Sequence, residues 1–380
     1  MNLKKQLSNM DYWLVISVTI LSIFGIICIG SATHINLGED PSNFYMQMVW
    51  FAIGFVIMII MMTIDYNFIS QFYIPLYILN IILLIAVLFF GTKVNNAVRW
   101  IRIGPVSLQP SEFSKLIMIF CLAKFIDKKK EKINNISILI IVCALTFFPL
   151  ALIMKQPSLS ASLVLLAILG IELFVAGLSF KFIGSFLAVT IPTVGFVFWD
   201  VSREAPLIVD KVLKPHQMDR IRAFLDPASN PDEYYQTMKS INAIGSGQLN
   251  GKGLYHGTLN QLSYLPEPHN DFIFSVIGEE FGFIGCIAVL VLLLFIVFRC
   301  VLIAMSTRDF FSQLIVAGVA GMFAFQTFVN VGVATGIIPN TGMSLPFVSY
   351  GGSSMWTNMA SIGLVLNIGL RRSRSLFEGV

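Results

Sequence analysis

Residues 271–300 read DFIFSVIGEEFGFIGCIAVLVLLLFIVFRC. Its acids are Asp271, Glu279 and Glu280. The uncharged run that follows Glu280 has about 18 residues, which is long enough for a helix to cross the hydrocarbon core of a bilayer. We therefore predict a membrane helix over this stretch, entered from a polar segment at Asp271.

Comparable apolar runs recur along the whole chain. Of its 380 residues, 56% are hydrophobic and 12% are charged, whereas soluble domains carry about 25% charged residues. The sequence therefore predicts an all-α polytopic integral membrane protein with about ten transmembrane helices. We expect these helices near 11–32, 44–64, 72–91, 109–127, 136–154, 159–178, 181–200, 271–300, 310–337 and 345–370.

One large polar segment, 201–270, separates the seventh and eighth expected helices. Loops of this length are uncommon inside compact proteins unless they are functional or disordered. Its apolar residues, among them Phe224, Tyr234 and Ile241, favour short packed amphipathic helices, with a solvated connector as the alternative. We predict a single membrane domain over 1–380 that includes this loop.

The basic residues indicate the orientation of the chain. Cytoplasmic loops of membrane proteins are enriched in lysine and arginine, and one side of the alternating topology collects most of them. That side receives Lys4, Lys5, Lys128, Lys129, Lys130, Lys132, Lys181, Arg299, Arg308, Arg371, Arg372 and Arg374. We expect cytoplasmic N- and C-termini in a plasma membrane, a retained first helix, and loop 201–270 on the outer face.

Asp271 is the first candidate for chemistry, because a carboxylate at the mouth of a membrane helix is costly to desolvate. It would share a helix face with Ser275, Gly278 and Gly282. Asp271 is a candidate general base if it reaches a hydroxyl proton. The alternative is that Asn270 or Asp271 only caps the helix.

Three further constellations gather cations and helix breaks on the outer side. In QPSEFSK, Pro110 and Ser111 suit a helix start, while Glu112 and Lys115 can pair on one face. In this constellation Lys115, with Arg99 and Arg102, either faces an anionic ligand or is neutralised structurally. Lys155-Gln156-Pro157 is either a binding element or a break beside a snorkelling lysine.

The third constellation is the glycine-rich segment from Pro346 to Ser354. It either opens a half-helix whose free N–H groups suit a phosphate or forms a packing kink. Broken backbone at membrane depth is tolerated where protein or water satisfies it. These features together favour an amphipathic anionic substrate such as a lipid-linked phosphate.

Other classes of site lack support in the sequence. The glycines around Gly245-Ser246-Gly247 have no strand–turn–helix context for a nucleotide. The four histidines lack paired zinc-ligand spacing, and the five cysteines read as buried apolar residues. The net charge of +4 gives no reason to expect nucleic acid.

These stretches resemble the SEDS family (shape, elongation, division and sporulation) across most of the chain. The resemblance rests on VRWIRIGPVSLQPSEFSKL, KQPSLSASL, RIRAFLDPASNPDEYYQ, AIGSGQLNGKGLYHGTLNQLSYLPEPHNDFIFSVIGEEFGFIG and NTGMSLPFVSYGGSS. RIRAFLDP and GKGLYHGTLNQLSYLPE favour its RodA branch over the FtsW and sporulation branches, which share much of this sequence.

The resemblance implies a peptidoglycan glycosyltransferase that polymerises lipid II in cell-wall elongation, with a class B penicillin-binding transpeptidase and other elongation-complex membrane proteins as partners. By resemblance, Asp271 matches an essential acid, and we assign it as general base. The family's aspartate is replaced by Ser158 here, and Ser107 stands where many members have a basic residue.

Undecaprenyl diphosphate would be the leaving group, stabilised by cations or by a divalent metal such as Mg²⁺ or Mn²⁺. The candidate substrate-binding residues are Arg99, Trp100, Gln109, Ser111, Glu112, Lys115, Lys155, Gln156, Arg220, Arg222, Glu267, His269, Ser349, Gly351, Gly352 and Ser353. The alternatives are a lipid II flippase, since broken helices and intramembrane charges also fit transporters, and a scaffold without catalysis.

Overall fold

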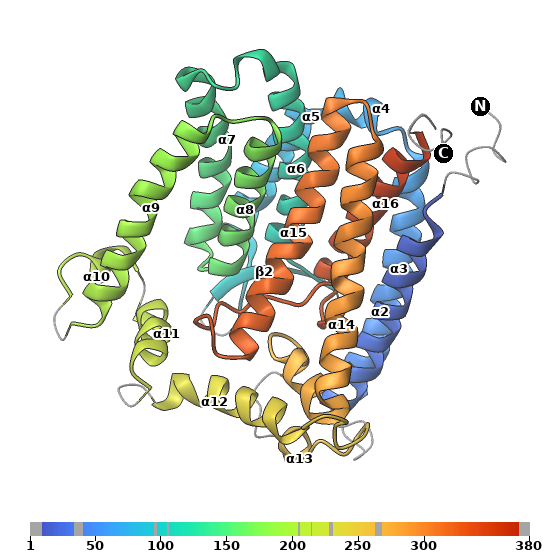
Figure 1. Ribbon diagram of the computed structural model, residues 1–380, viewed down its shortest axis with the longest axis vertical. Helices are drawn as coiled ribbons and strands as arrows, with labels where there is room; N and C mark the ends of the chain where they lie inside the picture. The colour runs from blue at the N-terminus through green and yellow to red at the C-terminus, as the bar shows by residue number, and fades with distance from the viewer. Residues whose placement is uncertain are drawn as a thin grey trace.

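The computed structural model describes residues 10–33, 41–94, 97–104, 106–203, 206–213, 215–227, 231–262 and 268–371. Within these ranges, ten long helices run between the two ends of the molecule (Figure 1). They are α2 (Tyr12–Ala32), α3 (Ser42–Thr63), α5 (Tyr73–Phe90), α6 (Pro110–Lys128), α7 (Ile136–Lys155), α8 (Leu159–Val175), α9 (Phe180–Val201), α14 (Ile273–Ser306), α15 (Phe310–Ala334) and α16 (Gly352–Arg371). They correspond one to one with the ten predicted apolar runs, so the predicted polytopic all-α fold is confirmed.

Seven of the long helices are apolar and long enough to cross a membrane: α2, α3, α5, α7, α9, α14 and α15. The helix α8 is apolar but shorter, at 17 residues. The helices α6 and α16 contain more polar residues, and the bundle buries much of both. Many of their polar side chains are therefore enclosed by neighbouring helices and do not face lipid.

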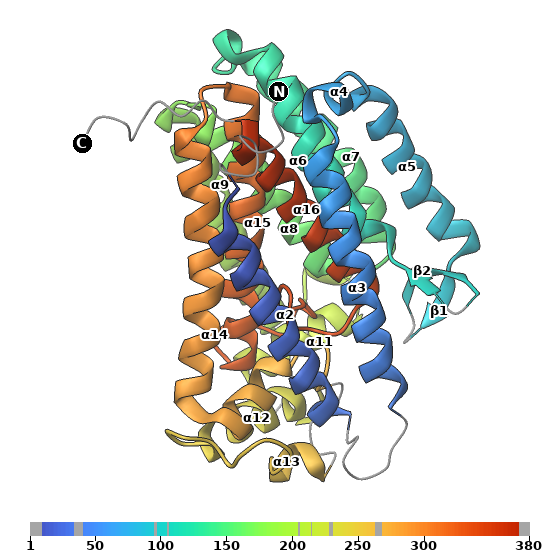
Figure 2. The same ribbon diagram turned by 90° about the vertical axis from the view of Figure 1, so that its right-hand side faces the viewer.

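The centre of the bundle is formed by helices distant in sequence. The helix α3 packs along α16, α14 packs along α15, and α15 packs along α8 and α6. Figure 2 shows α16 running between α3 and α15. The helix α9 stands apart at one side (Figure 1), and its most apolar stretch of 18 residues contains no buried position.

The polar segment folds into short helices in the half of the molecule away from the chain termini (Figure 1). They are α10 (Val209–Val212), α11 (Pro215–Leu225), α12 (Pro231–Ser246) and α13 (Thr258–Gln261). The helix α12 packs against α14, so the expectation of packed amphipathic helices is confirmed.

The helix α14 is broken at Gly282, whose φ of 64° and ψ of −161° are non-helical. The loop before α13 replaces the hydrogen bonds lost at the break. Gly253 N donates to Glu280 O (2.9 Å) and Phe283 N donates to Gln248 O (2.8 Å). The predicted helix 271–300 is therefore two segments that begin at Ile273 and end at Ser306.

This geometry corrects the prediction for Asp271. Phe272 occupies the N-cap position of α14, so Asp271 lies before the helix and does not share a helical face with Ser275. Neither Asn270 nor Asp271 occupies the cap position, so the capping alternative is wrong. The physical reason is that the chain runs through consecutive turns up to Phe272 and becomes helical only afterwards.

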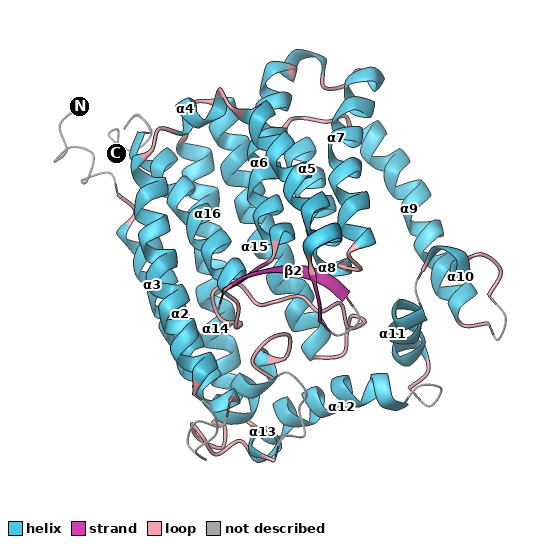
Figure 3. Ribbon diagram, turned by 180° about the vertical axis from the view of Figure 1, so that it is seen from behind, coloured by secondary structure: helices cyan, strands magenta, loops and turns pink. Residues whose placement is uncertain are grey.

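A small antiparallel sheet forms the loop 92–108 (magenta in Figure 3). Its strands are β1 (Thr92–Val94), β2 (Ala97–Ile103) and β3 (Val106–Leu108), in the order β1-β2-β3. Thr92 pairs with Trp100, and Ile101 pairs with Leu108. The sequence analysis identified only a loop here; the sheet is what positions Arg99 and Trp100.

Both predicted helix breaks are present. The helices α7 and α8 are interrupted after Lys155, and residues 335–351 between α15 and α16 contain no helix. The predicted helix 345–370 begins later, at Gly352, because residues 345–351 form turns that include Phe347 at a φ of 65°.

Two ion pairs join helices at the end of the bundle that carries the chain termini. Arg299 contacts Asp11 (2.6 Å) and Arg371 contacts Asp65 (2.5 Å). The short helix α4 (Tyr66–Ser70) and the 3₁₀ turn η2 (Lys130–Lys132) lie at this same end (Figure 1). The opposite end of the molecule carries α12 and α13 (Figure 1).

Candidate functional site

The turn carrying Asp271 is fastened through three consecutive carbonyl oxygens. Tyr350 N donates to His269 O (2.9 Å), and Ser349 Oγ donates to Asn270 O (2.7 Å). Asn330 Nδ2 in α15 donates to Asp271 O (2.9 Å). The backbone at Asp271 is thus held by α15 on one side and by the 345–351 segment on the other.

The Asp271 carboxylate borders Gly342 in the broken segment. A Cβ atom added at Gly342 would lie 3.3 Å from Asp271 Oδ2 and 3.9 Å from Arg220 Nη1. The glycine has a φ of +70°, a left-handed conformation that suits glycine. Gly342 therefore lets the carboxylate and the Arg220 guanidinium approach the same patch of backbone.

Arg99 belongs to the same electrostatic environment. Burial and the nearby Arg220 lower the pKa of Arg99, while the Asp271 carboxylate raises it. Two guanidinium groups thus act on one carboxylate. The site therefore combines one carboxylate with two cationic groups.

Arg99 is held in place by the break between α7 and α8. Its Nε donates to Gln156 O (3.1 Å), and its Nη2 donates to Pro157 O. The Gln156 side chain is buried and donates from Nε2 to Leu84 O (2.9 Å) in α5. Lys155 next to it has an exposed side chain. The KQP break therefore supports Arg99, and the half-buried Trp100 lies beside it on β2.

Two helix N-termini meet next to this region. Gln109, the N-cap of α6, donates its backbone N–H to Ser353 Oγ (2.9 Å) in the first turn of α16. Gly351 N, just before α16, donates to Gln47 Oε1 (3.1 Å). Gly352 begins α16 and packs against Trp50. Both helices direct the positive ends of their dipoles toward this point.

Pro110 and Ser111 lie at the start of α6, as expected, but Ser111 does not cap the helix. Gln109 holds the cap position without a side-chain hydrogen bond, Pro110 is the first helical residue, and Ser111 lies buried inside the first turn. The helix starts at Pro110 because proline fits the first turn, where its missing N–H is not needed.

Glu112 and Lys115 form the predicted pair, at 2.7 Å between Oε2 and Nζ. Lys115 is only 2% exposed. An ion that is buried to this degree needs its partner, because an uncompensated charge in this environment is strongly unfavourable. The pair is therefore a structural element of α6, which reduces the charge that Lys115 can offer to a ligand.

The remaining predicted residues do not all converge. Arg222 Nε donates to Val201 O (3.3 Å) at the end of α9, whereas Arg220 Nη1 donates to Asn340 O (3.4 Å) beside the site. The His269 ring packs edge-on against Tyr350, with centroids 5.5 Å apart. Glu267 lies outside the described residues.

The sequence analysis missed Gln47, Asn330 and Gly342. Gln47 and Asn330 are fully buried amides within apolar helices, and polar residues inside membrane segments are costly and often functional. That signal was available for both amides. For Gly342 there was none, because a glycine in a loop does not reveal which side chain it approaches.

A preformed metal centre is not visible in the part of the chain that the structure describes. No three His, Cys, Asp or Glu side chains gather there in an arrangement that could hold a metal ion. The residues at Asp271 are one carboxylate among arginines. They do not fit a metal site built by the protein alone.

Comparison with known proteins identifies the family. Residues 11–374 match the family model of FtsW, RodA and SpoVE, described as "Cell cycle protein". The chain belongs to the SEDS family. The match covers every long helix described above and includes all the candidate residues.

Curated relatives of this SEDS chain include both named branches. It is 37% identical over 371 residues to the probable peptidoglycan glycosyltransferase FtsW of Trichlorobacter lovleyi, covering 96% of this chain and 94% of the relative. It is 34% identical over 368 residues to the peptidoglycan glycosyltransferase MrdB of Escherichia coli K12, with the same coverage of 96% and 94%.

Solved structures share the fold. A chain from a peptidoglycan synthase complex that coordinates polymerization and crosslinking aligns with a TM-score of 0.78 and 30% identity, covering 95% of this chain and 97% of that one. The rod shape determining protein RodA of Thermus thermophilus aligns with a TM-score of 0.69 and 27% identity, covering 96% and 97%.

Proposed function

We propose that this SEDS chain is a peptidoglycan glycosyltransferase that polymerises lipid II into glycan strands, the activity class for which its relatives are named. The observation that carries the proposal is the Asp271 carboxylate, held on a fixed turn beside Arg220, with Arg99 in electrostatic interaction with it. A base near two cations is suited to a reaction in which a proton is removed while an anionic group departs.

In the proposed reaction, Asp271 accepts the proton of the acceptor sugar's 4-hydroxyl as that oxygen attacks the anomeric carbon of the donor. A new carbon–oxygen bond forms with inversion, and the bond to the diphosphate breaks. The electron pair leaves with undecaprenyl diphosphate. Positioned cations stabilise such developing charge, and Arg99, Arg220 and the N-termini of α6 and α16 are the groups we assign to it.

The test is polymerisation of purified lipid II by the full chain with its transpeptidase partner, comparing the native protein with Asp271→Asn. Loss of a general base costs about 10²–10⁴-fold in rate. Asp219→Asn on α11 is the matched control and should keep the native rate. A folded Asp271→Asn protein that polymerises at the native rate contradicts the assignment. Lipid II movement across sealed liposomes without glycan product would favour a flippase instead.

For the cofactor, we propose that any Mg²⁺ or Mn²⁺ requirement is met by an ion that arrives with the substrate diphosphate. Mg²⁺ is commonly held by one or two carboxylates together with substrate phosphates. Chelator should then lower activity without lowering the melting temperature of the substrate-free protein.

For the location, we propose a bacterial plasma membrane with cytoplasmic termini and the site on the extracytoplasmic side. Support comes from Lys128, Lys129, Lys130 and Lys132, which are exposed at the end of the molecule that carries the termini, as the positive-inside rule requires. A membrane-impermeant thiol reagent applied to intact cells should label a cysteine introduced at Leu249 but not one introduced at Lys130.

For the biological role, we propose the RodA branch, with a class B penicillin-binding transpeptidase and elongation-complex proteins as partners. Support comes from the RIRAFLDP and GKGLYHGTLNQLSYLPE stretches and from the fold shared with the Thermus RodA. Depletion in the source bacterium should abolish rod elongation while division septa still form. Filamentation without septa would assign the chain to the division branch.

A further inference from the structure

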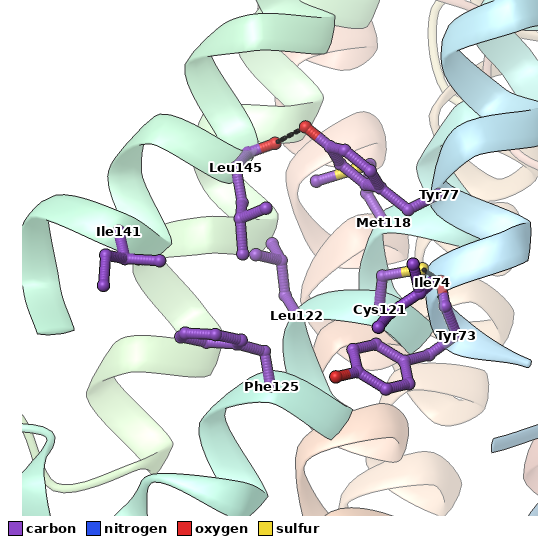
Figure 4. A pocket seen from close by; sticks show the side chains of 9 residues that line it. All are labelled: Tyr73, Ile74, Tyr77, Met118, Cys121, Leu122, Phe125, Ile141 and Leu145. Carbon is purple, nitrogen blue, oxygen red and sulfur yellow. Dashed lines mark hydrogen bonds between the residues drawn. The ribbon is translucent and has the colours of Figure 1, made fainter. Parts of the chain in front are cut away.

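An apolar cavity lies between α5, α6 and α7, away from Asp271, with a volume of about 230 Å³. Its lining residues are Tyr73, Ile74, Tyr77, Met118, Cys121, Leu122, Phe125, Ile141 and Leu145 (Figure 4). The floor is formed by α6, where Met118, Cys121 and Leu122 are buried. Ile74 on α5 and Ile141 on α7 are exposed at 53% and 44%, so the cavity opens between these two helices toward the lipid.

The polar groups in the cavity wall have partners within the protein. Tyr77 Oη donates to Leu145 O (3.0 Å), and Cys121 Sγ donates to Tyr73 O (3.2 Å). The interior therefore presents hydrocarbon and aromatic surface to an occupant. An apolar cavity of about 150 Å³ accommodates benzene, so this larger cavity suits a segment of a hydrocarbon chain.

The mouth of the cavity is basic. Tyr73 is the first residue of α5, and Lys128 Nζ lies 3.4 Å from its hydroxyl oxygen and 4.4 Å from its ring centroid. The end of α6 and the loop that follows it expose Lys128, Lys129, Lys130 and Lys132, which outnumber the acids Asp127 and Glu131. Hydrocarbon surface below a lysine cluster is complementary to an acyl chain below a negatively charged headgroup.

We propose that this cavity binds an anionic glycerophospholipid, with one acyl chain between α5 and α7 and the headgroup phosphate at Lys128 and the neighbouring lysines. A transmembrane helix of a partner protein is about 10 Å across and does not fit a cavity of 230 Å³. The site lies at the end of the bundle that carries the termini, so this lipid is distinct from the substrate proposed for Asp271.

Native mass spectrometry of the full chain in mild detergent, supplied with equal amounts of phosphatidylglycerol and phosphatidylcholine, tests the proposal. Phosphatidylglycerol should be retained preferentially. Ile141→Phe should narrow the cavity and reduce retention of phosphatidylglycerol. Ile140→Phe should not, because Ile140 is also exposed on α7, at 60%, but does not line the cavity. Lys128→Gln should lower phosphatidylglycerol affinity about fivefold, the contribution of one lysine near an anionic lipid surface, while Lys181→Gln on α9 should not.

Three results would overturn the proposal. The first is equal retention of both phospholipids, and the second is indistinguishable retention by the Ile141→Phe and Ile140→Phe proteins. The third is displacement of phosphatidylglycerol by an equimolar amount of undecaprenyl phosphate, which would assign the cavity to a polyprenyl chain. Lys128 is exposed, so its variant remains informative even if the cavity variant folds poorly.

Discussion

Asn330 donates its side-chain amide to the main-chain oxygen of Asp271 (2.9 Å) and also to Met343 O (2.6 Å). One buried amide in α15 therefore joins the turn that carries the candidate base to the broken segment that faces it. The two segments are distant in sequence, and this amide fixes their separation. We therefore expect Asn330 to act as a positioning residue, with an effect on catalysis that passes through Asp271.

We expect Asn330→Leu to lower the turnover of lipid II polymerisation by at least about tenfold, with little change in the substrate concentration for half-maximal rate. Two buried carbonyl groups would lose their donor, which costs about 1–3 kcal/mol each, and the melting temperature should fall as well. Asn80→Leu in α5 is the matched control, because Asn80 is buried but its Nδ2 has no partner among the described residues. Equal turnover in the two variants would contradict the positioning role.

Gly342 is the next position to test, because its α-carbon faces the carboxylate directly. Gly342→Ala should lower polymerisation strongly, since the new methyl carbon would lie 3.3 Å from Asp271 Oδ2 and would crowd any acceptor hydroxyl there. A non-glycine residue in this conformation also costs roughly 1–2 kcal/mol. Gly177→Ala separates the two effects, because Gly177 has a φ of +81° but open space around it. Its activity should stay near native.

Much of the fold was predictable because membrane helices reveal themselves by length and apolarity alone. The ten apolar runs were recognised in this way. Asp271, Arg99 and the broken 338–354 segment were identified as candidates because charged side chains and unpaired backbone groups are energetically unfavourable at membrane depth. The errors occurred where tertiary contacts override local pattern. The break of α14 at Gly282 depends on hydrogen bonds with the 248–253 loop, and these contacts leave no signal in the local sequence pattern.

Some members of the candidate site were predictable from the sequence, but its geometry was not. Arg220 and Arg222 are both arginines on α11, so the sequence does not distinguish their roles. The packing of α11 decides that Arg220 contacts Asn340 and that Arg222 contacts Val201. The same holds for Gln156, which serves through its backbone carbonyl as a support for Arg99. A sequence specifies which groups are present; their direction follows from packing.

The two arginines of α11 provide a matched pair. Arg220→Gln should reduce polymerisation by about 10²-fold, because removal of one preorganised donor to developing charge costs about that much. Arg222→Gln should leave turnover within a small factor of native, since its guanidinium holds the end of α9 instead. The polymerisation rates of the two purified variants test this prediction. A larger loss of rate for Arg222→Gln than for Arg220→Gln would place the substrate on the other face of α11.

Gly282 is required for folding on physical grounds. Its φ of 64° and ψ of −161° lie in a region accessible essentially only to glycine, and an added Cβ would lie 2.6 Å from Leu249 O. We expect Gly282→Ala to lower the melting temperature in detergent markedly and to reduce the yield of folded protein. Gly170→Ala in α8, where nothing lies within 4 Å of the new methyl, should melt like the native chain.

The buried Glu112–Lys115 pair allows its structural and ligand-binding roles to be separated. Lys115→Met leaves the Glu112 carboxylate uncompensated, and breaking a buried pair in this way costs about 3–5 kcal/mol. Replacing both partners, as Glu112→Gln with Lys115→Met, should restore much of the lost melting temperature, because no charge then remains to be paired. If Lys115 serves only α6, the double variant should also regain polymerisation. Restored stability without restored activity would show instead that the ammonium group contacts the substrate, as the sequence analysis first proposed.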